Sequence, residues 1–393
     1  MNYNETLKYI NNTPKFSKIL GNEDLIKLLN KLGNPHNNLR FIHVAGTNGK
    51  GSVCAMTAQI LQDAGFRTGI YTSPFIEVFN ERIQVDGENI PDSELAEIAS
   101  YVKSTIDELK IEISVFAQIT AMAFIYFNRR KCDYVVLETG LGGRLDATNV
   151  ISTPTIIAIT KIGLDHTEYL GESISEIAFE KCGIIKNKVP VITCGNQNSE
   201  ALSVIEKYCK TKESPLLVAP SDCDFKLSLK GQYQKSNAAI AASIARQLGI
   251  CDEHIKNGLL NTHWIARFEF LRDNLIIDGG HNPDGISALI SALKELNRPV
   301  RFVVAMMNDK DYLKSAALLA SLGGCVTVTE IDMPRCIKAD ELKNAFPGCH
   351  VEKNCITAVK KALDICGENE IVCVCGSLYL AGAVRPYFKE QHS

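Results

Sequence analysis

The feature that most constrains the fold is a pattern that recurs along the chain: a short apolar run, a polar or glycine-rich tip, and then a segment with helical periodicity. Apolar runs of this kind cover residues 41–45, 68–71, 134–137, 155–160 and 189–193. Runs that are apolar on both faces and alternate with helices are typical of a parallel sheet. Ligands gather at the carboxyl ends of the strands in such sheets, and the polar tips lie there.

The same pattern restarts near Asn274, after a helix expected over residues 237–248. Further strands are expected over 274–277, 300–306, 325–331 and 371–375, with helices between them. A length of 393 residues suits two or three domains. We therefore expect a larger α/β domain over residues 1–264 and a smaller one over residues 265–393.

Composition excludes several classes of protein. The net charge of −3 gives no electrostatic reason to bind nucleic acid or an anionic membrane. No apolar run approaches the roughly 20 residues of a membrane helix, and the first residues do not resemble a signal peptide. The fourteen cysteines include no CxxC pair, so free thiols in a reducing compartment are expected rather than a zinc ribbon. These features predict a cytoplasmic protein.

The sharpest local signal is the glycine-rich segment 46–52, which follows one expected strand and precedes a helix expected from Ser52 to Gly65. Glycines let backbone amides approach an anion, and a helix N-terminus favours negative charge. Lys50 is placed to neutralise the β and γ phosphates of a nucleotide. The common P-loop pattern has Ser or Thr directly after the lysine, whereas here Gly51 intervenes before Ser52. The alternative is a glycine-rich turn that binds no phosphate.

Other strand tips carry side chains that suit a magnesium ion beside a triphosphate. Glu138 and His166 each end an expected strand, and a carboxylate and an imidazole are suitable ligands. Ser73 offers a hydroxyl, although a serine before a proline is usually a turn residue. Taken singly, each residue is equally compatible with a hydrogen-bonded loop position.

Three further residues have ordinary structural roles as alternatives to a functional role when each is considered alone. Lys181 falls late in an expected helix, where an exposed lysine is the ordinary reading. Asp278 and His281 form the polar tip of the first strand in the second domain. They could equally be a helix N-cap and a loop histidine.

Together these segments resemble the folylpolyglutamate synthase and dihydrofolate synthase family of the wider Mur ligase group. The matching segments occur in the family's order, and the shifted P-loop is itself the family's form. They are residues 43–52, 71–75, 80–83, 138–149, 164–167, 180–184, 278–283 and 376–382. The resemblance implies a P-loop parallel-sheet ATP-binding domain followed by a smaller Rossmann-like glutamate-ligase domain.

The resemblance also implies a reaction. ATP phosphorylates a carboxylate of a folate or of dihydropteroate, and the amine of L-glutamate then attacks the acyl phosphate. A carboxylate is a poor electrophile, so phosphorylation supplies a leaving group. Because two anions must meet, the site needs cations, namely Lys50, magnesium and Arg82. Two magnesium ions are implied, and a monovalent cation is left open.

Roles carried over from the family fall on specific positions. ATP is contacted by Gly46, Thr47, Asn48, Gly49, Lys50, Gly51, Ser52, Asn237, Arg267 and Asp278. Metal is held by Ser73, Glu138, His166 and Lys181, and folate is bound near Ser73, Pro74, Phe75 and Arg82. The catalytic set is Lys50, Lys181, Asp278 and His281, of which the last two help to place glutamate.

Lys181 matches a lysine that the family carries as a carbamate, which turns a cation into an anion near the metals. Formation of a carbamate requires a deprotonated amine, and burial lowers a lysine pKa in that direction.

The chain departs from the family pattern in four places, all away from the phosphate and metal positions. Ala117 replaces a glutamate, Tyr233 stands where histidine is common, and Ile265-Ala266 precedes Arg267 in place of Pro-Gly or Pro-Ala. The link over residues 224–231 is short, and the usual hairpin is not expected there. These changes bear on which acceptor is selected.

Two other readings stay open at the level of sequence. One is a Mur-type ligase with a different carboxylate acceptor, and the other is a non-catalytic binder that has kept the fold. Residues 80–83 and 376–382 favour folate, whereas Ala117 alone favours the binder. The absence of an apolar stripe or heptad pattern favours a monomer.

Overall fold

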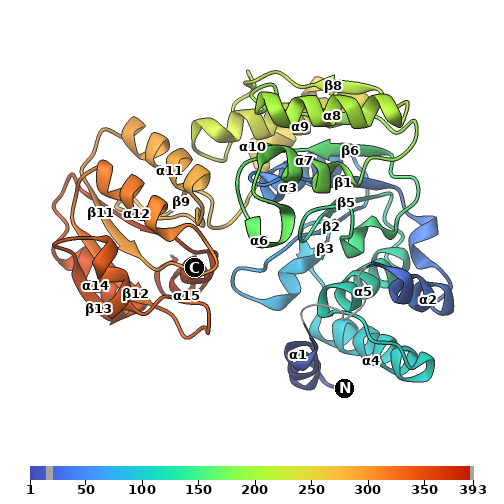
Figure 1. Cartoon of the computed structure of the whole chain (residues 1–393), viewed down its shortest axis with the longest axis horizontal. Coiled ribbons are helices and arrows are strands. Elements are labelled where there is room, and N and C mark those ends of the chain that lie inside the picture. The colour runs from blue at the N-terminus through green and yellow to red at the C-terminus, as the bar shows by residue number, and fades with distance from the viewer. Residues whose placement is uncertain (15–20, 390–393) are drawn as a thin grey trace. The chain divides into compact units, whose positions relative to one another are not determined.

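A computed structural model of the chain describes residues 1–14 and 21–389 (Figure 1). The chain divides into two compact units. Unit 1 comprises residues 1–226 and 236–262, and unit 2 comprises residues 227–235 together with the chain from His263 onward. The sequence places its boundary after residue 264 and gives no sign that residues 227–235 group with the second unit.

Unit 1 is built on an eight-stranded sheet in the order β4-β3-β2-β5-β1-β6-β7-β8. Its strands are β1 (Phe41–Ala45), β2 (Thr68–Tyr71), β3 (Ile83–Val85), β4 (Glu88–Asn89), β5 (Tyr134–Glu138), β6 (Ile156–Ile159), β7 (Val191–Thr193) and β8 (Leu216–Val218). Strand β1 pairs in parallel with β5 and β6, so that Val44 lies opposite Glu138 and Ala45 lies opposite Ile159. This register brings the polar tips of three strands to one edge of the sheet.

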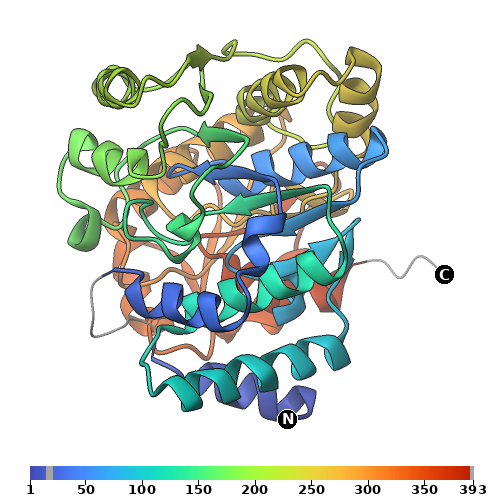
Figure 2. The same ribbon diagram turned by 90° about the vertical axis from the view of Figure 1, so that its right-hand side faces the viewer.

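Helices cover both faces of this sheet. They are α1 (Tyr3–Asn12), α2 (Glu23–Lys31), α3 (Lys50–Asp63), α4 (Asp92–Leu109), α5 (Val115–Arg129), α6 (Thr167–Leu170), α7 (Ile174–Cys182), α8 (Ser199–Thr211), α9 (Gln232–Gln247, which begins in unit 2) and α10 (Asp252–Asn261), with 3-10 turns η1 (Pro35–Asn38), η2 (Phe79–Arg82) and η3 (Ala147–Val150). Figure 2 shows α7 and α8 on one side of the sheet and α3 and α10 on the other. Helix α3 packs on β1, β2 and β5, and α10 packs on α3.

Unit 2 contains a six-stranded sheet in the order β13-β12-β11-β14-β10-β9. Its elements are β9 (Glu269–Arg272), β10 (Leu275–Ile277), α11 (Pro283–Glu295), β11 (Val300–Val304), α12 (Tyr312–Ser321), β12 (Val326–Glu330), α13 (Ala339–Leu342), η4 (Lys343–Ala345), β13 (His350–Asn354), α14 (Cys355–Asp364), β14 (Ile371–Cys375) and α15 (Leu378–Phe388). All its pairs are parallel except β9 with β10. Asp278 follows β10 directly, at the carboxyl end of a central strand.

The parallel sheets predicted from the apolar runs are confirmed, and the errors lie at the sheet edges. Strands β3, β4, β8, β9 and β13 were not predicted, and three of them pair antiparallel. Strands β4, β8, β9 and β13 are short, partly exposed edge strands, so they lack the continuous apolar run of a buried strand. Strand β3 lies inside the sheet, next to β4, and has only three residues. All fourteen cysteines are free thiols, as predicted. Within the described residues, no helix combines the length and apolarity needed to cross a membrane.

Candidate active site

The phosphate loop predicted from the sequence connects β1 to α3. Helix α3 begins at Lys50, two residues before the predicted start. Gly46 and Gly49 have φ values of 151° and 88°. A Cβ on Gly46 would lie 1.8 Å from Thr160 Oγ1, and a Cβ on Gly49 would lie 2.3 Å from Asn237 Oδ1. Both positions therefore require glycine. Asn237, which was predicted to contact ATP, lies against this loop.

The tip of the neighbouring strand β6 holds the loop in shape. The amides of Thr47 and Asn48 donate to the Lys161 carbonyl at 3.0 and 3.2 Å. The Thr160 hydroxyl donates to the Asn48 carbonyl at 2.8 Å. The Thr47 hydroxyl donates to the Gly163 carbonyl at 3.0 Å. The amides that open α3, from Lys50 to Ser52, have no preceding helical turn to bond and can face an anion.

Lys50 and Glu138 lie side by side at the carboxyl ends of β1 and β5. The Lys50 Nζ donates to the Thr47 carbonyl at 3.4 Å and lies 3.9 Å from Glu138 Oε1. The other carboxylate oxygen, Oε2, accepts from the Ser73 backbone amide at 3.1 Å. The side chain of Glu138 is only 4% exposed. A cation and a hard oxygen ligand thus meet beside the loop that would hold the phosphates.

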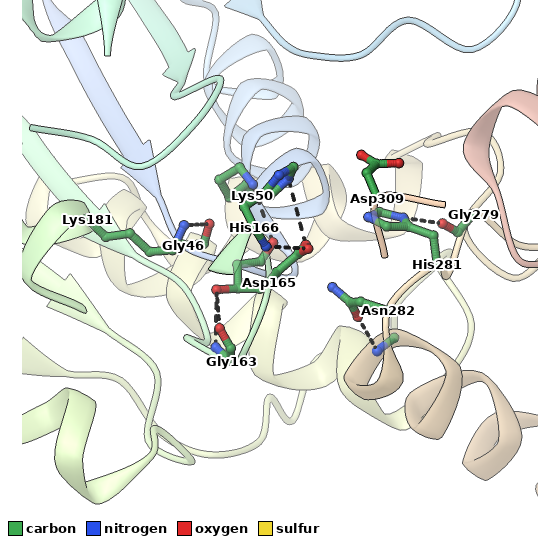
Figure 3. Close-up of polar contacts among 12 residues, drawn as sticks. Gly46, Lys50, Gly163, Asp165, His166, Lys181, Gly279, His281, Asn282 and Asp309 are labelled. Atoms are coloured by element: carbon green, nitrogen blue, oxygen red, sulfur yellow. Dashed lines mark hydrogen bonds and ion pairs between the residues drawn. The ribbon is translucent and has the colours of Figure 1, made fainter. Parts of the chain in front are cut away.

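Lys181 is buried, so the reading of this residue as an exposed helical lysine is wrong. It lies near the end of α7, and its Nζ donates to the Gly46 carbonyl at 2.8 Å (Figure 3). The structure thereby joins Lys181 to the phosphate loop across 135 residues of sequence.

His166 has the left-handed backbone conformation, with φ of 51°. Its amide donates to Asp165 Oδ1 at 2.9 Å, and its Nε2 lies 4.0 Å from Asp165 Oδ2. In the described part of the chain, no cluster of three or more His, Cys, Asp or Glu side chains is arranged to hold a metal. Of the four predicted metal ligands, the structure joins Ser73 and Glu138 by a hydrogen bond. Metal binding by the set stays a prediction.

The residues predicted to bind folate lie on the loop that leaves β2. Ser73 and Pro74 share a cis peptide bond. The Arg82 guanidinium carbon lies 5.5 Å from the centre of the Phe75 ring and 5.7 Å from that of Phe79. The two rings are 5.9 Å apart and meet edge to face. This cluster offers an aromatic surface and a cation on one loop.

In unit 2, Asp278 is a fully engaged buried carboxylate. Its Oδ2 accepts from the Phe268 amide at 2.8 Å and its Oδ1 accepts from the Gly280 amide at 2.7 Å. The Tyr233 hydroxyl lies 3.5 Å from Oδ2. Burial raises the pKa of Asp278, and the positive charge of Arg267 opposes that rise. The alternative that Asp278 is a helix N-cap is wrong, because Asn282 caps α11.

The neighbours of Asp278 have an unusual backbone. Arg267 lies between Ala266 and Phe268, which have φ values of 55° and 50°. The Gly279 amide donates to the Ala266 carbonyl at 2.8 Å, which ties this turn to the strand tip. His281 Nδ1 lies 2.9 Å from the Gly279 carbonyl (Figure 3). Unit 2 thus brings Arg267, Asp278 and His281 to one strand end, and ligand binding by these residues stays a prediction.

Comparison with known proteins agrees with this geometry. Residues 44–190 match the Mur ligase middle domain, and residues 266–378 match the Mur ligase glutamate ligase domain. The folylpolyglutamate synthase of Lacticaseibacillus casei is 36% identical, over 98% of both chains. The dihydrofolate synthase/folylpolyglutamate synthase of Bacillus subtilis is 33% identical, over 98% of this chain and 99% of its own.

The chain belongs to the folylpolyglutamate synthase and dihydrofolate synthase family. A solved structure of E. coli FolC in complex with DHPP and ADP has a TM-score of 0.90 at 28% identity, and the match covers 98% of this chain and 96% of that chain. Family membership confirms the resemblance read from the motifs, the α/β fold class and the ligase class.

A buried network that the sequence reading missed organises the loop after Glu138. Asp146 Oδ2 accepts from the amides of Gly140 and Leu141, both at 2.9 Å. Asp146 Oδ1 accepts from the Thr148 hydroxyl at 2.5 Å, and that hydroxyl lies 2.8 Å from His43 Nε2 on β1. Since the hydroxyl has one proton, it accepts from His43, whose Nε2 therefore carries hydrogen.

Burial lowers the pKa of His43 to about 3, so the ring is neutral and carries a proton on only one of its nitrogens. An aspartate two residues before a threonine in a polar loop is an Asx-turn signal, and that signal could have identified Asp146.

Proposed function

We propose that this chain is an ATP-dependent ligase that adds L-glutamate to folates, with dihydropteroate as a second acceptor to be tested. The observation that carries the proposal is the placement of Lys50 beside Glu138 at the end of the phosphate loop. That pair supplies a cation for phosphates, and it lies in a chain that matches folylpolyglutamate synthases along nearly its whole length. The E. coli FolC structure, which holds ADP, supports ATP as the phosphoryl donor.

The chemistry proceeds in two displacements. A carboxylate oxygen of the folate attacks the γ phosphorus of ATP, and ADP leaves. The glutamate amine, as its free base, then attacks the acyl carbon. The nitrogen loses one proton, phosphate leaves as hydrogen phosphate, and an amide remains. Lys50 and the amides at the start of α3 stabilise the charge that gathers on the transferring phosphoryl group.

Ser73 and Glu138 fit the hard cation that such a reaction uses. Glu138 presents a buried carboxylate beside the phosphate loop, and Ser73 adjoins it through its amide. Carboxylate and hydroxyl oxygens suit Mg²⁺, and we propose His166 and carbamylated Lys181 as the remaining members of the set. Bound there, Mg²⁺ would offset the negative charge of the triphosphate.

A carbamate on Lys181 would change the charge next to the loop from positive to negative. Burial disfavours an ammonium, which supports formation of the carbamate. The present hydrogen bond from Nζ to the Gly46 carbonyl uses one amine proton, and a carbamate nitrogen retains one proton for the same bond. The modification is therefore compatible with the contact that fixes the side chain.

For unit 2 we propose that Asp278 and His281 place the incoming glutamate and that Arg267 contacts the nucleotide. In unit 1, Asn237 is proposed to contact the nucleotide because it lies against Gly49. We also propose that residues 1–264 and 265–393 act as the ATPase and glutamate-ligase domains and that the enzyme is a cytoplasmic monomer.

The proposed function is tested by following ADP release with L-glutamate and a panel of acceptors. We expect turnover with a tetrahydrofolate. Turnover with dihydropteroate would add the dihydrofolate synthase activity, and turnover with cell-wall precursors alone would establish the runner-up, a Mur-type ligase with a different acceptor. If the protein binds ATP but releases no ADP with any acceptor, the result would favour the hypothesis of a non-catalytic binder.

A further inference from the structure

The loop that carries the proposed folate residues is closed at its base. It leaves β2 at Tyr71 and returns to β3 at Ile83, and the Thr72 amide donates to the Arg82 carbonyl at 3.1 Å. Loops of this shape, with close ends and no internal strand, are held by their own side chains. The side chain that holds this one is that of Glu81, to which no role has been assigned so far.

The Glu81 carboxylate accepts hydrogen bonds from three consecutive backbone amides. Oε2 accepts from Ile76 at 2.7 Å, and Oε1 accepts from Glu77 at 2.9 Å and from Val78 at 2.8 Å. Successive amides that converge on one anion form a nest, and an ionised acceptor strengthens each bond. A single carboxylate therefore fixes the backbone of residues 76–78.

The neighbouring residue Asn80 anchors the same turn to the body of unit 1. Its Nδ2 donates to the Ile90 carbonyl at 2.6 Å and to Asp92 Oδ1 at 2.9 Å. Its Oδ1 accepts from the Tyr3 hydroxyl of α1 at 2.9 Å. Turn η2 is thus fixed from outside the loop, and the Glu81 carboxylate links that fixed turn to the backbone of residues 76–78.

We propose that Glu81 is a positioning residue for the folate ring. By fixing residues 76–78 it sets where Phe75 lies relative to Arg82, whose guanidinium carbon is 5.5 Å from the Phe75 ring. An aromatic face and a cation held at this spacing suit a flat, electron-rich heteroaromatic ring on a substrate that also carries carboxylates. The proposal rests on the proposed function, since it assigns Glu81 to the acceptor and not to the nucleotide.

The test combines steady-state kinetics with amide hydrogen exchange on the full chain. Glu81→Gln keeps the side-chain size but replaces one acceptor oxygen with an NH₂ donor, so at least one amide of the nest loses its partner. We expect the KM for the tetrahydrofolate to rise about tenfold, with kcat and the KM for ATP changed less than twofold. Exchange at residues 76–78 should become faster, while α3 stays protected. Glu88→Gln, on exposed strand β4 of the adjacent hairpin, is the matched control.

Glu81→Asp is the second variant, because it keeps the charge but shortens the reach by one methylene group; it should show the same pattern if Glu81→Gln does not fold. A fall in kcat with equal rises in the KM for the tetrahydrofolate and the KM for ATP would overturn the proposal. Faster exchange at residues 76–78 with an unchanged KM for the tetrahydrofolate would also overturn it. Wild-type protein without ligase activity would refute the proposed function instead. Amide hydrogen exchange and equilibrium binding of the tetrahydrofolate would then test the role of Glu81 without a measurement of turnover. Unchanged binding of the tetrahydrofolate by Glu81→Gln would refute that role.

Discussion

The two units each present a polar site at the carboxyl end of a parallel strand, yet they hold it in place by different means. In unit 1 the phosphate loop depends on glycines at 46 and 49, where a side chain would collide with Thr160 or Asn237. In unit 2 the turn before Asp278 uses non-glycine residues with positive φ, and a buried carboxylate bonds two amides of the surrounding turns. One site is shaped by the absence of side chains and the other by a buried charge. Substitutions should therefore fail in different ways in the two units.

The largest effect is expected from Lys50→Ala. Lys50 is the only lysine in the phosphate loop, so turnover should be almost abolished while the protein still folds. Steady-state kinetics and a thermal melt measure the two properties. A variant that kept more than about a tenth of the wild-type kcat, a barrier change below roughly 1.4 kcal/mol, would show that Lys50 does not hold the phosphates.

Lys181→Ala is expected to be almost inactive and to recover part of its activity with added acetate. The reason is that acetate can replace the carbamate oxygens in the space that the side chain leaves. A structure at neutral pH should also show extra density on the wild-type amine. A near-normal kcat in Lys181→Ala would refute the hypothesis that Lys181 acts as a carbamate. Lys186→Ala, a lysine beyond the end of the same helix, is the control.

Gly46→Ala tests the claim that unit 1 relies on missing side chains. Its Cβ would lie 1.8 Å from Thr160 Oγ1, so either the loop or β6 must shift, and we expect a loss of about 2–3 kcal/mol in the free energy of unfolding. Gly65→Ala separates sterics from backbone strain, because Gly65 has φ of 84° but no atom within 4 Å of the new Cβ. Urea denaturation should show a smaller loss, about 1 kcal/mol, for Gly65→Ala. Equal losses would contradict the steric argument.

Asp278→Asn tests the buried charge of unit 2 through the pH dependence of stability. Burial raises the pKa of Asp278 in the folded state, so between the unfolded and folded pKa values the native state binds more protons than the unfolded state. Stability from this group is therefore present at low pH and is lost as pH rises through the folded pKa. Urea unfolding from pH 4 upward should show a shallower decline in Asp278→Asn. An unchanged slope would mean that Asp278 does not titrate differently on folding.

The smallest effect is expected from Ala266→Gly. Ala266 has φ of 55°, a conformation that costs a residue with a Cβ about 1 kcal/mol, and glycine relieves that cost but loses buried methyl contact. We expect a gain of about 0.5 kcal/mol in the free energy of unfolding. Ala292→Gly, inside α11, should instead lose about 1 kcal/mol. A loss of the same size at Ala266 would show that the turn is not strained.

Part of this architecture could be predicted from the sequence, because the signals are local. Each of these signals depends only on residues that are neighbours in the sequence. They are apolar runs longer than a turn, glycines followed by a lysine, and proline or asparagine at helix starts. They located the central strands, the phosphate loop and the tip at Asp278. The edge strands β4, β8, β9 and β13 were missed because partial exposure removes the apolar run on which the prediction depends, and β3 was missed because it is only three residues long.

The sequence by itself determined the order of the central strands along the chain, the glycine-rich loop and the family. Only the tertiary structure decided which distant side chains meet. Lys181 reaches the Gly46 carbonyl because β1 and β6 are neighbours in the sheet and α7 follows β6, and no local pattern encodes that order. The same holds for Thr148 with His43 and for Tyr233 with Asp278. Burial, and with it the shifted pKa values of His43 and Asp278, arises only when segments far apart in the chain exclude water together.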